Sequence, residues 1–359
     1  MVLIKIKYIV WVINLKVYFR TNFDRKIGIG HLSRTYNLYL ELKKIYKCKV
    51  VIDSEQKNIP FFKNSKNLLY LYGKNKFESE KKDAELFIKK NLRNKKNIVI
   101  VDDYRLGKLW EKKISPYASK IVAIDDFIQR KHCADILVNT KPELNIISPE
   151  TLKVIKNYNK NGAELLLGSK YSIINNLFAK KNNIKNRKSF NITFYNGGSG
   201  NILIYAKIIK LITKIQKKVT INLVCGPFAK NTNFVISKYK KKRNIKIINK
   251  NEDFYKTLIN TNLLVGSCGL ISFEAAKIKL PSILFVMNEN QKINKNTLEE
   301  IGHYFILDKK DIKNSKKVAA LIMICFQNYK RIKRIMNQSK FDVNHDGKKL
   351  IIKSILKKK

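Results

Sequence analysis

Short apolar segments recur along the chain, and stretches of helix length with mixed apolar and polar residues separate them. The apolar segments are continuous rather than alternating, which is typical of strands buried on both faces of a sheet. Strands that alternate with helices predict parallel sheets. The predicted strands are residues 15–21, 48–53, 97–103, 120–126, 135–139, 189–196, 219–226, 245–249, 261–267 and 282–287.

A polar, basic segment without periodicity divides these strands into two sets. One hydrophobic core rarely grows beyond about 250–300 residues, and the chain has 359. We therefore expect an α/β domain at 1–180, a linker at 181–190, and a second α/β domain at 191–359, whose final helix is free to pack back on the first. Ligands bind beyond the carboxyl ends of the strands in open parallel sheets. Two such domains facing each other would hold a ligand in the cleft between them.

Lysine dominates the charge of the chain. The sequence contains 74 Lys and Arg against 27 Asp and Glu, a formal net charge of +47. Such a charge attracts polyanions in general, but the lysines lie along the whole chain between apolar segments, as solvated loops and helix ends do. We find no aromatic-spaced RNA motif, zinc-finger spacing or recognition-helix pattern. We therefore expect no specific nucleic-acid partner.

The cysteines and the apolar segments indicate the compartment. The five cysteines are scattered and form no CxxC motif, which is typical of free thiols in a reducing environment. The N-terminal apolar stretch is too short for a signal sequence, and no apolar segment reaches about 18 residues. We expect a cytoplasmic monomer without a membrane span. Residues 1–12 precede the first motif and read as an extension or a misplaced start.

The first candidate site is GIGH at residues 28–31, after the first strand and before a helix predicted at about 32–44. Its glycines allow close approach of a ligand, and the helix start presents free N–H groups. The positive end of the helix dipole disfavours a charged ring, which suits His31 to act as a general base. A tight turn capped by His31 explains the spacing equally well. Arg34 either neutralises a ligand, packs against Asp24 or lies on the surface.

Asp pairs end two neighbouring predicted strands, at residues 102–103 and 125–126. Adjacent strand residues point to opposite faces, so at most one Asp of each pair should face a ligand. Helix capping accounts for the other. We take Asp103 and Tyr104 as candidates for ligand contact and assign His132 to a structural turn. No cluster has metal-ligand spacing, so we predict no metal and no other cofactor.

Small residues follow two strands of the second predicted domain. The segment NGGSGN at 196–201 forms either a backbone nest for an anionic oxygen or an ordinary turn. The segment 266–272 is a small-residue turn into a helix that contains Glu274. Its N–H groups suit a diphosphate, and Glu274 has the reach for a ribose diol. Polar residues that include Asn290 and Gln291 follow the next strand.

These motifs, in this order, resemble those of the UDP-2,4-diacetamido-2,4,6-trideoxy-β-L-altropyranose hydrolases of pseudaminic acid synthesis. The resemblance extends from about Val17 to the C-terminal helix. It rests on FRTN, IGIGHLSR, DDFIQRKHCAD, LLGSKY and GGSG, and on Glu274, Pro281 and Asn290-Gln291.

This sequence departs from the family pattern at three places. Asn22 and Gly200 stand where the family has Asp, and residues 266–272 replace a glycine-rich AGGST turn. The departures bear on the sugar and on the pyrophosphate contact more than on the fold.

The resemblance implies a GT-B fold, in which two Rossmann-like domains with parallel sheets face each other across a cleft. The hydrolase family is related in fold to the GlcNAc transferase of lipid II synthesis, and a family of spore-coat polysaccharide proteins shares its motif pattern. The resemblance also implies metal-independent, inverting hydrolysis of a UDP-sugar at C1, with His31 as the base. The expected binding residues are Arg20, Gly28, Gly30, Arg34, Asp103, Tyr104, Gly197, Gly198, Ser199, Gly269, Ser272, Glu274, Asn290 and Gln291. Three alternatives stay open: a GT-B glycosyltransferase, a UDP-GlcNAc 2-epimerase, and a non-catalytic protein that binds nucleotide sugars or polyanions.

Overall fold

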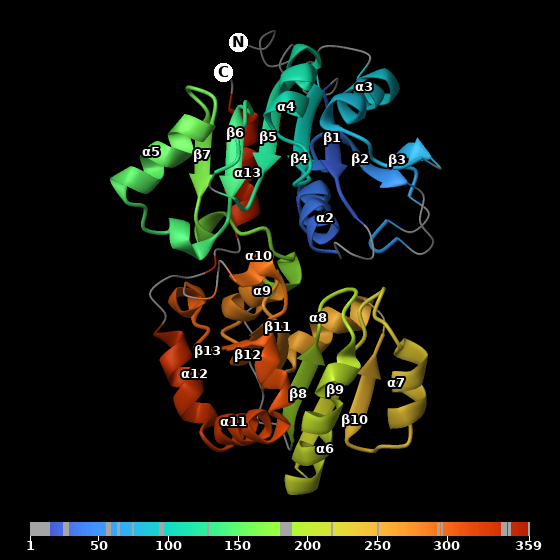
Figure 1. Ribbon diagram of the computed structural model, residues 1–359, viewed down its shortest axis with the longest axis vertical. Coiled ribbons are helices and arrows are strands. Elements are labelled where there is room, and N and C mark those ends of the chain that lie inside the picture. The colour runs from blue at the N-terminus through green and yellow to red at the C-terminus, as the bar shows by residue number, and fades with distance from the viewer. Residues whose placement is uncertain are drawn as a thin grey trace, which may run out of the picture. The chain divides into compact units, whose positions relative to one another are not determined.

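Figure 1 shows the computed structural model of the chain, which describes residues 15–23, 29–54, 59–62, 65–73, 75–92, 97–127, 129–179, 189–216, 218–249, 251–292, 295, 297–338, 343 and 346–357. These residues form two compact units. The first contains the described residues up to 173, except 29–30, together with 346–357. The second contains 29–30 and the described residues from 174 to 343. The expected linker lies outside the described residues except for its last two positions, as do residues 1–12.

The first unit is built on a seven-stranded sheet with all strands parallel, in the order β3-β2-β1-β4-β5-β6-β7. The chain starts in the middle at β1, builds one side of the sheet, and returns through β4 to build the other, as in a Rossmann-like sheet. The strands are β1 (Lys16–Thr21), β2 (Lys47–Ser54), β3 (Leu68–Gly73), β4 (Asn97–Asp102), β5 (Ala118–Ile124), β6 (Ile136–Asn139) and β7 (Glu164–Leu167). The helices are α2 (Gly30–Leu42), α3 (Glu80–Asn91), α4 (Lys108–Ile114), α5 (Pro149–Tyr158) and α13 (Gly347–Leu356).

The central strand β4 shows why the sequence folds this way. All six of its residues are buried, as its continuous apolar sequence predicts for a strand covered on both faces. On one face, Val99 and Val101 pack in a core with Phe87 of α3 and Trp110 of α4. Ile98, Ile100 and Asp102 point to the opposite face. Parallel pairing of Thr21 with Asp102 places the carboxyl end of β4 beside that of β1.

The C-terminal helix α13 packs on the first unit. Lys120 of β5 is buried, and its ammonium donates hydrogen bonds to two carbonyls of the last turn of α13 and to the carbonyl of Lys357, at 2.7 Å. A cation there satisfies carbonyls that no helical N–H reaches and is stabilised by the helix dipole. At the other end, a Cβ added to Gly347 would stand 2.5 Å from the Ser172 carbonyl oxygen. These two contacts tie both ends of α13 to the unit.

The second unit is built on a six-stranded parallel sheet in the order β10-β9-β8-β11-β12-β13. Its core includes strand residues such as Phe194 and Phe285, and helix residues such as Ile208 and Ile322. The strands are β8 (Phe190–Tyr195), β9 (Val219–Val224), β10 (Ile245–Ile248), β11 (Leu263–Ser267), β12 (Ser282–Val286) and β13 (Phe305–Asp308). The helices are α6 (Ala206–Ile215), α7 (Thr232–Tyr239), α8 (Asn251–Ile259), α9 (Ile271–Lys277), α10 (Glu289–Lys292), α11 (Ser315–Gln327) and α12 (Tyr329–Asn337).

All ten predicted strands are present, with ends that differ by no more than two residues. The sequence analysis missed β3, β7 and β13, which all lie at sheet edges. All four residues of β13 are only partly buried, and two of the four in β7 are. The sequences of β7 and β13 are mostly apolar but only four residues long, and so short a run does not distinguish a strand from part of a buried helix. Within the described residues, no helix has the length and apolar character needed to cross a membrane.

Candidate functional site

In each sheet the candidate residues follow the two strands at which the winding reverses. That point lies between β1 and β4 in the first unit and between β8 and β11 in the second. Loops that leave such neighbouring strands turn to opposite faces, which opens a crevice at the carboxyl edge. His31 follows β1 and Asp102 ends β4, whereas segments 196–201 and 268–270 follow β8 and β11.

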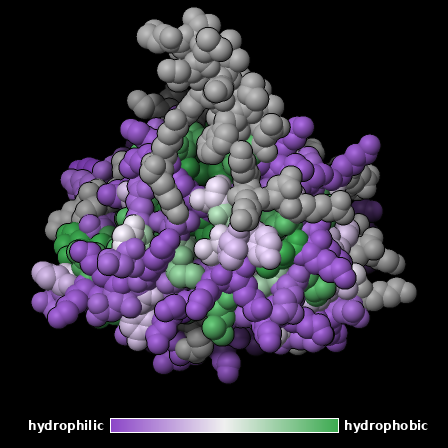
Figure 2. Space-filling model, turned by 90° about the horizontal axis from the view of Figure 1, so that it is seen from above, coloured by the Kyte–Doolittle hydropathy of each residue, from purple (hydrophilic) through white to green (hydrophobic). Residues whose placement is uncertain are grey.

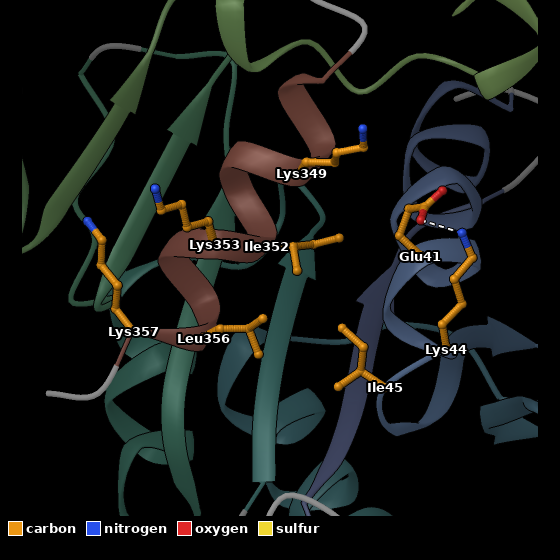
Figure 3. A pocket seen from close by; sticks show the side chains of 8 residues that line it. All are labelled: Glu41, Lys44, Ile45, Lys349, Ile352, Lys353, Leu356 and Lys357. Atoms are coloured by element: carbon orange, nitrogen blue, oxygen red, sulfur yellow. Dashed lines mark hydrogen bonds and ion pairs between the residues drawn. The ribbon is translucent and has the colours of Figure 1, made fainter.

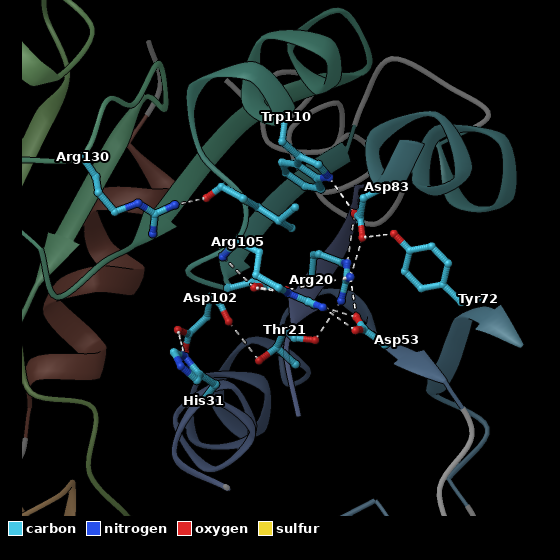
Figure 4. Close-up of polar contacts among 12 residues, drawn as sticks. Arg20, Thr21, His31, Asp53, Tyr72, Asp83, Asp102, Arg105, Trp110 and Arg130 are labelled. Carbon is cyan, nitrogen blue, oxygen red and sulfur yellow. Dashed lines mark hydrogen bonds and ion pairs between the residues drawn. The ribbon is translucent and has the colours of Figure 1, made fainter. Parts of the chain in front are cut away.

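His31, the second residue of α2, lies against the end of β4 (Figure 4). Its Nδ1 is 2.6 Å from Oδ1 of Asp102, and its ring meets that of Tyr104 edge-on, with centroids 4.5 Å apart. The side chain is 10% exposed, and Nε2 has no hydrogen-bond partner among the described residues. Because a carboxylate accepts hydrogen bonds, Nδ1 carries the proton and Nε2 keeps a lone pair. The ring is therefore oriented with a nitrogen free to take a proton.

Asp102 is buried and also binds Arg34. Nε of Arg34 is 2.8 Å from Oδ2, and one terminal nitrogen is 2.6 Å from Oδ1. Burial alone would raise the pKa of Asp102, but the charge of Arg34 and the contact with His31 outweigh burial and lower the pKa to about 2. Asp102 is therefore an anion at neutral pH.

Arg34 joins Asp102 to the second Asp pair. Its other terminal nitrogen lies 3.0 and 3.1 Å from the two carboxylate oxygens of Asp126, which also accepts a hydrogen bond from the Tyr104 hydroxyl. Burial and the charge of Asp126 raise the pKa of Tyr104, so the phenol keeps its proton. The side chain of Arg34 is 8% exposed. The interpretation of Arg34 as a surface residue is therefore wrong.

Arg20 lies in a buried network of charges (Figure 4). Its side chain is 0% exposed. The guanidinium donates to Asp83 at 3.2 and 2.5 Å, to Asp53 at 2.6 Å, and to the Thr21 carbonyl. These partners enclose the cation, so the structure gives Arg20 a supporting position beneath the carboxyl edge instead of the expected substrate contact.

Asp103 has a similar supporting position. It is buried and accepts hydrogen bonds from the side chain of Arg105 at 3.0 and 2.6 Å. Arg105 also binds Asp53, at 2.8 and 2.9 Å. Adjacent residues at a strand end point to opposite faces, and the structure turns Asp102 toward His31. The choice of Asp103 over Asp102 as the site residue is corrected accordingly.

In the second unit, the 196–201 turn meets a neighbouring loop at the level of the backbone. Gly197 has φ 74°, a left-handed conformation that favours glycine. A Cβ added to Gly226, after β9, would stand 2.5 Å from the Gly198 carbonyl oxygen. Ser199 is partly exposed, and its hydroxyl has no partner within the described part of the chain. Ser199 thus offers a ligand a partly exposed hydroxyl in this turn.

Gly200 explains one departure from the family pattern. A Cβ added there would stand 1.7 Å from the Asn196 carbonyl oxygen. No residue with a side chain fits that backbone, so the Asp of the family pattern is incompatible with this turn.

The turn between β11 and α9 is shaped by internal hydrogen bonds. Ser272 is buried, and its hydroxyl donates to the Gly269 carbonyl at 2.7 Å. Its own carbonyl accepts from Nε2 of His303, at 2.6 Å. Burial lowers the pKa of His303 to about 4, so its ring is neutral at pH 7. Ser272 therefore holds the turn together, and Gly269 is its more accessible member.

The remaining candidates of this unit lie beside that turn. Glu274 is 4% exposed in α9; its charge adds to burial in raising the pKa of Tyr195. The side-chain oxygen of Gln291 accepts from the Met287 N–H at 2.8 Å, and its nitrogen would lie 3.7 Å from a Cβ added to Gly269. The structure thus brings Gly269 and Gln291 together.

Two expected residues fall outside the description. Gly28 is not among the described residues, and neither is the side chain of Asn290. Gly30 begins α2, and a Cβ added to it would meet no atom within 4 Å. The space beside His31 at this position is therefore open.

His132 is buried between two carboxylates. Its Nδ1 is 2.6 Å from Glu111 and its Nε2 is 2.8 Å from Asp125. Burial would lower its pKa, but the two carboxylates outweigh burial and raise the pKa to about 9. All five cysteines are free thiols. In the described part of the chain, no three His, Cys, Asp or Glu side chains are placed to hold a metal ion.

The sequence analysis missed Asp126 as a partner of Arg34, and it missed Asp53, Asp83 and Arg105. One signal was available: Arg20 interrupts an apolar strand. A buried charge requires opposite charges around it, although the sequence does not say which ones.

No family model matches the chain. The chain is 26% identical over 314 residues to the uncharacterized protein MJ1062 of Methanocaldococcus jannaschii. This match covers 82% of this chain and 62% of MJ1062, so the chain spans less than two thirds of that relative.

The chain is similar in structure to MurG of Acinetobacter baumannii, with 11% identity, 95% of this chain and 99% of that chain covered, and a TM-score of 0.64. It is also similar to the UDP-GlcNAc 2-epimerase of Neisseria meningitidis bound to UDP-GlcNAc, with 13% identity, coverage of 96% and 100%, and a TM-score of 0.54. The glycosyltransferase WaaG of lipopolysaccharide biosynthesis matches with 11% identity, coverage of 95% and 100%, and a TM-score of 0.50. The prediction of a GT-B fold with Rossmann-like parallel sheets is confirmed.

Proposed function

We propose that this protein hydrolyses a UDP-sugar to UDP and the free sugar. The observation that carries the proposal is the His31–Asp102 pair at the carboxyl edge of the first sheet, which leaves Nε2 of His31 without a partner among the described residues. The fold is shared with a protein bound to UDP-GlcNAc, which supports a UDP-sugar as the ligand.

The sequence motifs support a finer assignment. By their resemblance to the hydrolases of pseudaminic acid synthesis, we propose a 2,4-diacetamido-2,4,6-trideoxyhexose as the sugar released. The reaction would then belong to nonulosonic acid biosynthesis.

His31 is the proposed general base. Its Nε2 takes a proton from a water molecule as the water oxygen forms a bond to C1 of the sugar. The bond between C1 and the diphosphate oxygen breaks, and its electron pair leaves with UDP, so the configuration at C1 inverts. Asp102 is anionic and 2.6 Å from Nδ1, so it stabilises the positive ring that forms. No metal enters this scheme.

The other expected residues divide between sugar and nucleotide. Arg34 and Tyr104 surround His31 and Asp102, so we assign them to the sugar side. The turn at residues 197–199 and Gly269 are assigned to the diphosphate, since turns of this kind present backbone N–H groups to anions. Glu274, Asn290 and Gln291 are assigned to the rest of UDP.

A panel of UDP-sugars tests the reaction. The protein is incubated with each sugar in water without an acceptor, UDP release is measured, and the anomer of the product is followed by NMR. We expect UDP release from at least one member and a product inverted at C1. Absence of UDP release from every member, or retention of configuration, contradicts the proposal.

The variants His31→Ala and His31→Asn test the base. Loss of a positioned base should lower turnover by about 10²–10⁴-fold. UDP binding, measured by calorimetry, should change little, because the residues assigned to UDP belong to the second unit. Turnover that is unchanged in both variants contradicts the role of His31.

Glycosyl transfer is the second candidate, favoured by the similarity to WaaG, a glycosyltransferase. The same base would then take its proton from an acceptor hydroxyl. UDP release that requires an added acceptor identifies a transferase, and release in water alone identifies a hydrolase.

A further inference from the structure

The first unit has a groove between α2 and α13, of about 530 Å³. Figure 3 shows Ile352 and Leu356 of α13 pointing toward Ile45, just beyond the C-terminal end of α2, while lysine ammonium groups extend outward around them. Ile45 is 43% exposed and Leu356 is 38% exposed. Large apolar side chains are thus open to solvent in the middle of a basic surface.

Two lysines of α13 and the residue that caps its C-terminal end form a stripe beside these apolar residues. Lys349, Lys353 and Lys357 recur at every fourth position, which places them on one side of the helix. Lys349 pairs with Asp346 at 2.7 Å and Lys357 with Glu164 at 3.2 Å. Exposed pairs of this kind contribute little and are screened by salt. An anionic surface can therefore compete for these lysines.

Further lysines lie at the amino edge of the sheet, where its strands begin. Lys44, near the end of α2, lines the groove and pairs with Glu41 at 2.6 Å. Lys16 and Lys47 begin β1 and β2 and are direct partners in the sheet register. Both are exposed, and within the described residues neither side chain has a hydrogen bond or ion pair. The same is true of the side chain of Lys353.

Figure 2 looks onto this end of the first unit, where hydrophilic side chains make up most of the coloured surface and separate apolar patches lie among them. We define the basic edge as Lys16, Lys44, Lys47, Lys353 and Lys357. His31 lies in the first turn of α2, at the opposite, carboxyl edge of the same sheet. Occupation of the basic edge would therefore leave His31 accessible.

We propose that the basic edge and the groove bind the anionic phospholipid surface of a membrane. The lysines would contact lipid phosphates, and Ile45 and Leu356 would enter the layer of acyl chains. Apolar and lysine stripes side by side are typical of helices that lie in a membrane interface, and clustered lysines are attracted to anionic lipids.

The choice of side chains favours a membrane over other anionic partners. Every cation of the groove is lysine, a point charge without directional demands, whereas a single bound phosphate is commonly recognised by arginine forks. The groove has no aromatic residue on which a nucleic-acid base could stack. Three apolar residues form its floor, too few for the successive anchors of a docked helix.

Sedimentation of the full chain with vesicles tests the proposal. We expect strong binding to phosphatidylcholine vesicles that contain phosphatidylglycerol, and little binding to phosphatidylcholine alone. In the variant K16E/K47E/K353E, the affinity for the anionic vesicles should fall by about a hundredfold or more. A second variant, I45S/L356S, should weaken binding about tenfold without a change in net charge.

The control is K240E/K241E/K242E, which reverses three exposed lysines of the second unit. It changes the net charge by the same amount as the first variant and should keep most of the binding. An equal loss in the control shows a general attraction of the +47 chain to anions and overturns the proposal. Equal binding to both vesicle types, or full binding by K16E/K47E/K353E, also overturns it. Thermal unfolding confirms that each variant is folded.

Discussion

The substitution Asp102→Asn tests whether His31 acts as a base through its orientation. It removes a negative charge and places an amide at the 2.6 Å contact with Nδ1. The amide nitrogen can donate to Nδ1, which moves the ring proton to Nε2. An Nε2 that already carries a proton cannot take one from water. We expect turnover to fall by about 10²–10⁴-fold, or about 2.7–5.5 kcal/mol of transition-state stabilisation.

The same substitution affects the fold, and the structure limits how much. Removing the sole partner of a buried ion costs about 3–5 kcal/mol. Arg34 would lose the charge of Asp102 but keep Asp126 at 3.0 and 3.1 Å. We therefore expect the free energy of unfolding to fall by less than about 3–5 kcal/mol, so that the variant can be assayed as a folded protein.

Turnover is measured as UDP release from whichever UDP-sugar the native protein hydrolyses, and folding is checked by thermal unfolding. Asp126→Asn is the matched control, because it also removes a negative charge next to Arg34 but Asp126 has no hydrogen bond to His31. We expect a smaller loss of turnover in Asp126→Asn than in Asp102→Asn. In a His31→Ala background, Asp102→Asn should cause no further loss, because both act through Nε2. A folded Asp102→Asn variant with native turnover, or a further loss in the His31→Ala background, refutes this reasoning.

Three further predictions concern stability. The pKa of His132 is about 9 in the folded chain and about 6.5 when unfolded, so its stabilising charge is fully present below about pH 6.5 and lost as pH rises through about 9. The free energy of unfolding in urea should fall across this window by up to about 3 kcal/mol, and by less in His132→Gln. Gly200→Asp should lower the free energy of unfolding by about 1–3 kcal/mol, because its Cβ would meet the Asn196 carbonyl oxygen. Native stability of this variant would contradict the turn geometry. Arg20→Met should cost about 3–5 kcal/mol because it leaves the buried carboxylate of Asp83 without its cation, and an unchanged melting temperature would count against the network.

The sequence predicted most where a residue's neighbours in the chain determine its environment. The continuous apolar run of β4 indicated a strand covered on both faces, and all its residues are buried. The alternation of such strands with helices predicted parallel sheets in two α/β units. Three of the four edge strands escaped prediction, although their sequences are mostly apolar. The two that are four residues long give too short a pattern to distinguish a strand from a buried turn of helix.

At the candidate site, sequence and tertiary structure contributed different things. The sequence by itself determined that a histidine follows the first strand at a helix start, and that acidic pairs end two other strands. Only the tertiary structure decided that Asp102, 71 positions away from His31, holds its ring, and that Arg20 and Asp103 are enclosed by partners. The physical reason is that hydrophobic burial is a local pattern along the chain. A hydrogen bond or ion pair depends on which face each side chain takes and which strands become neighbours in the sheet.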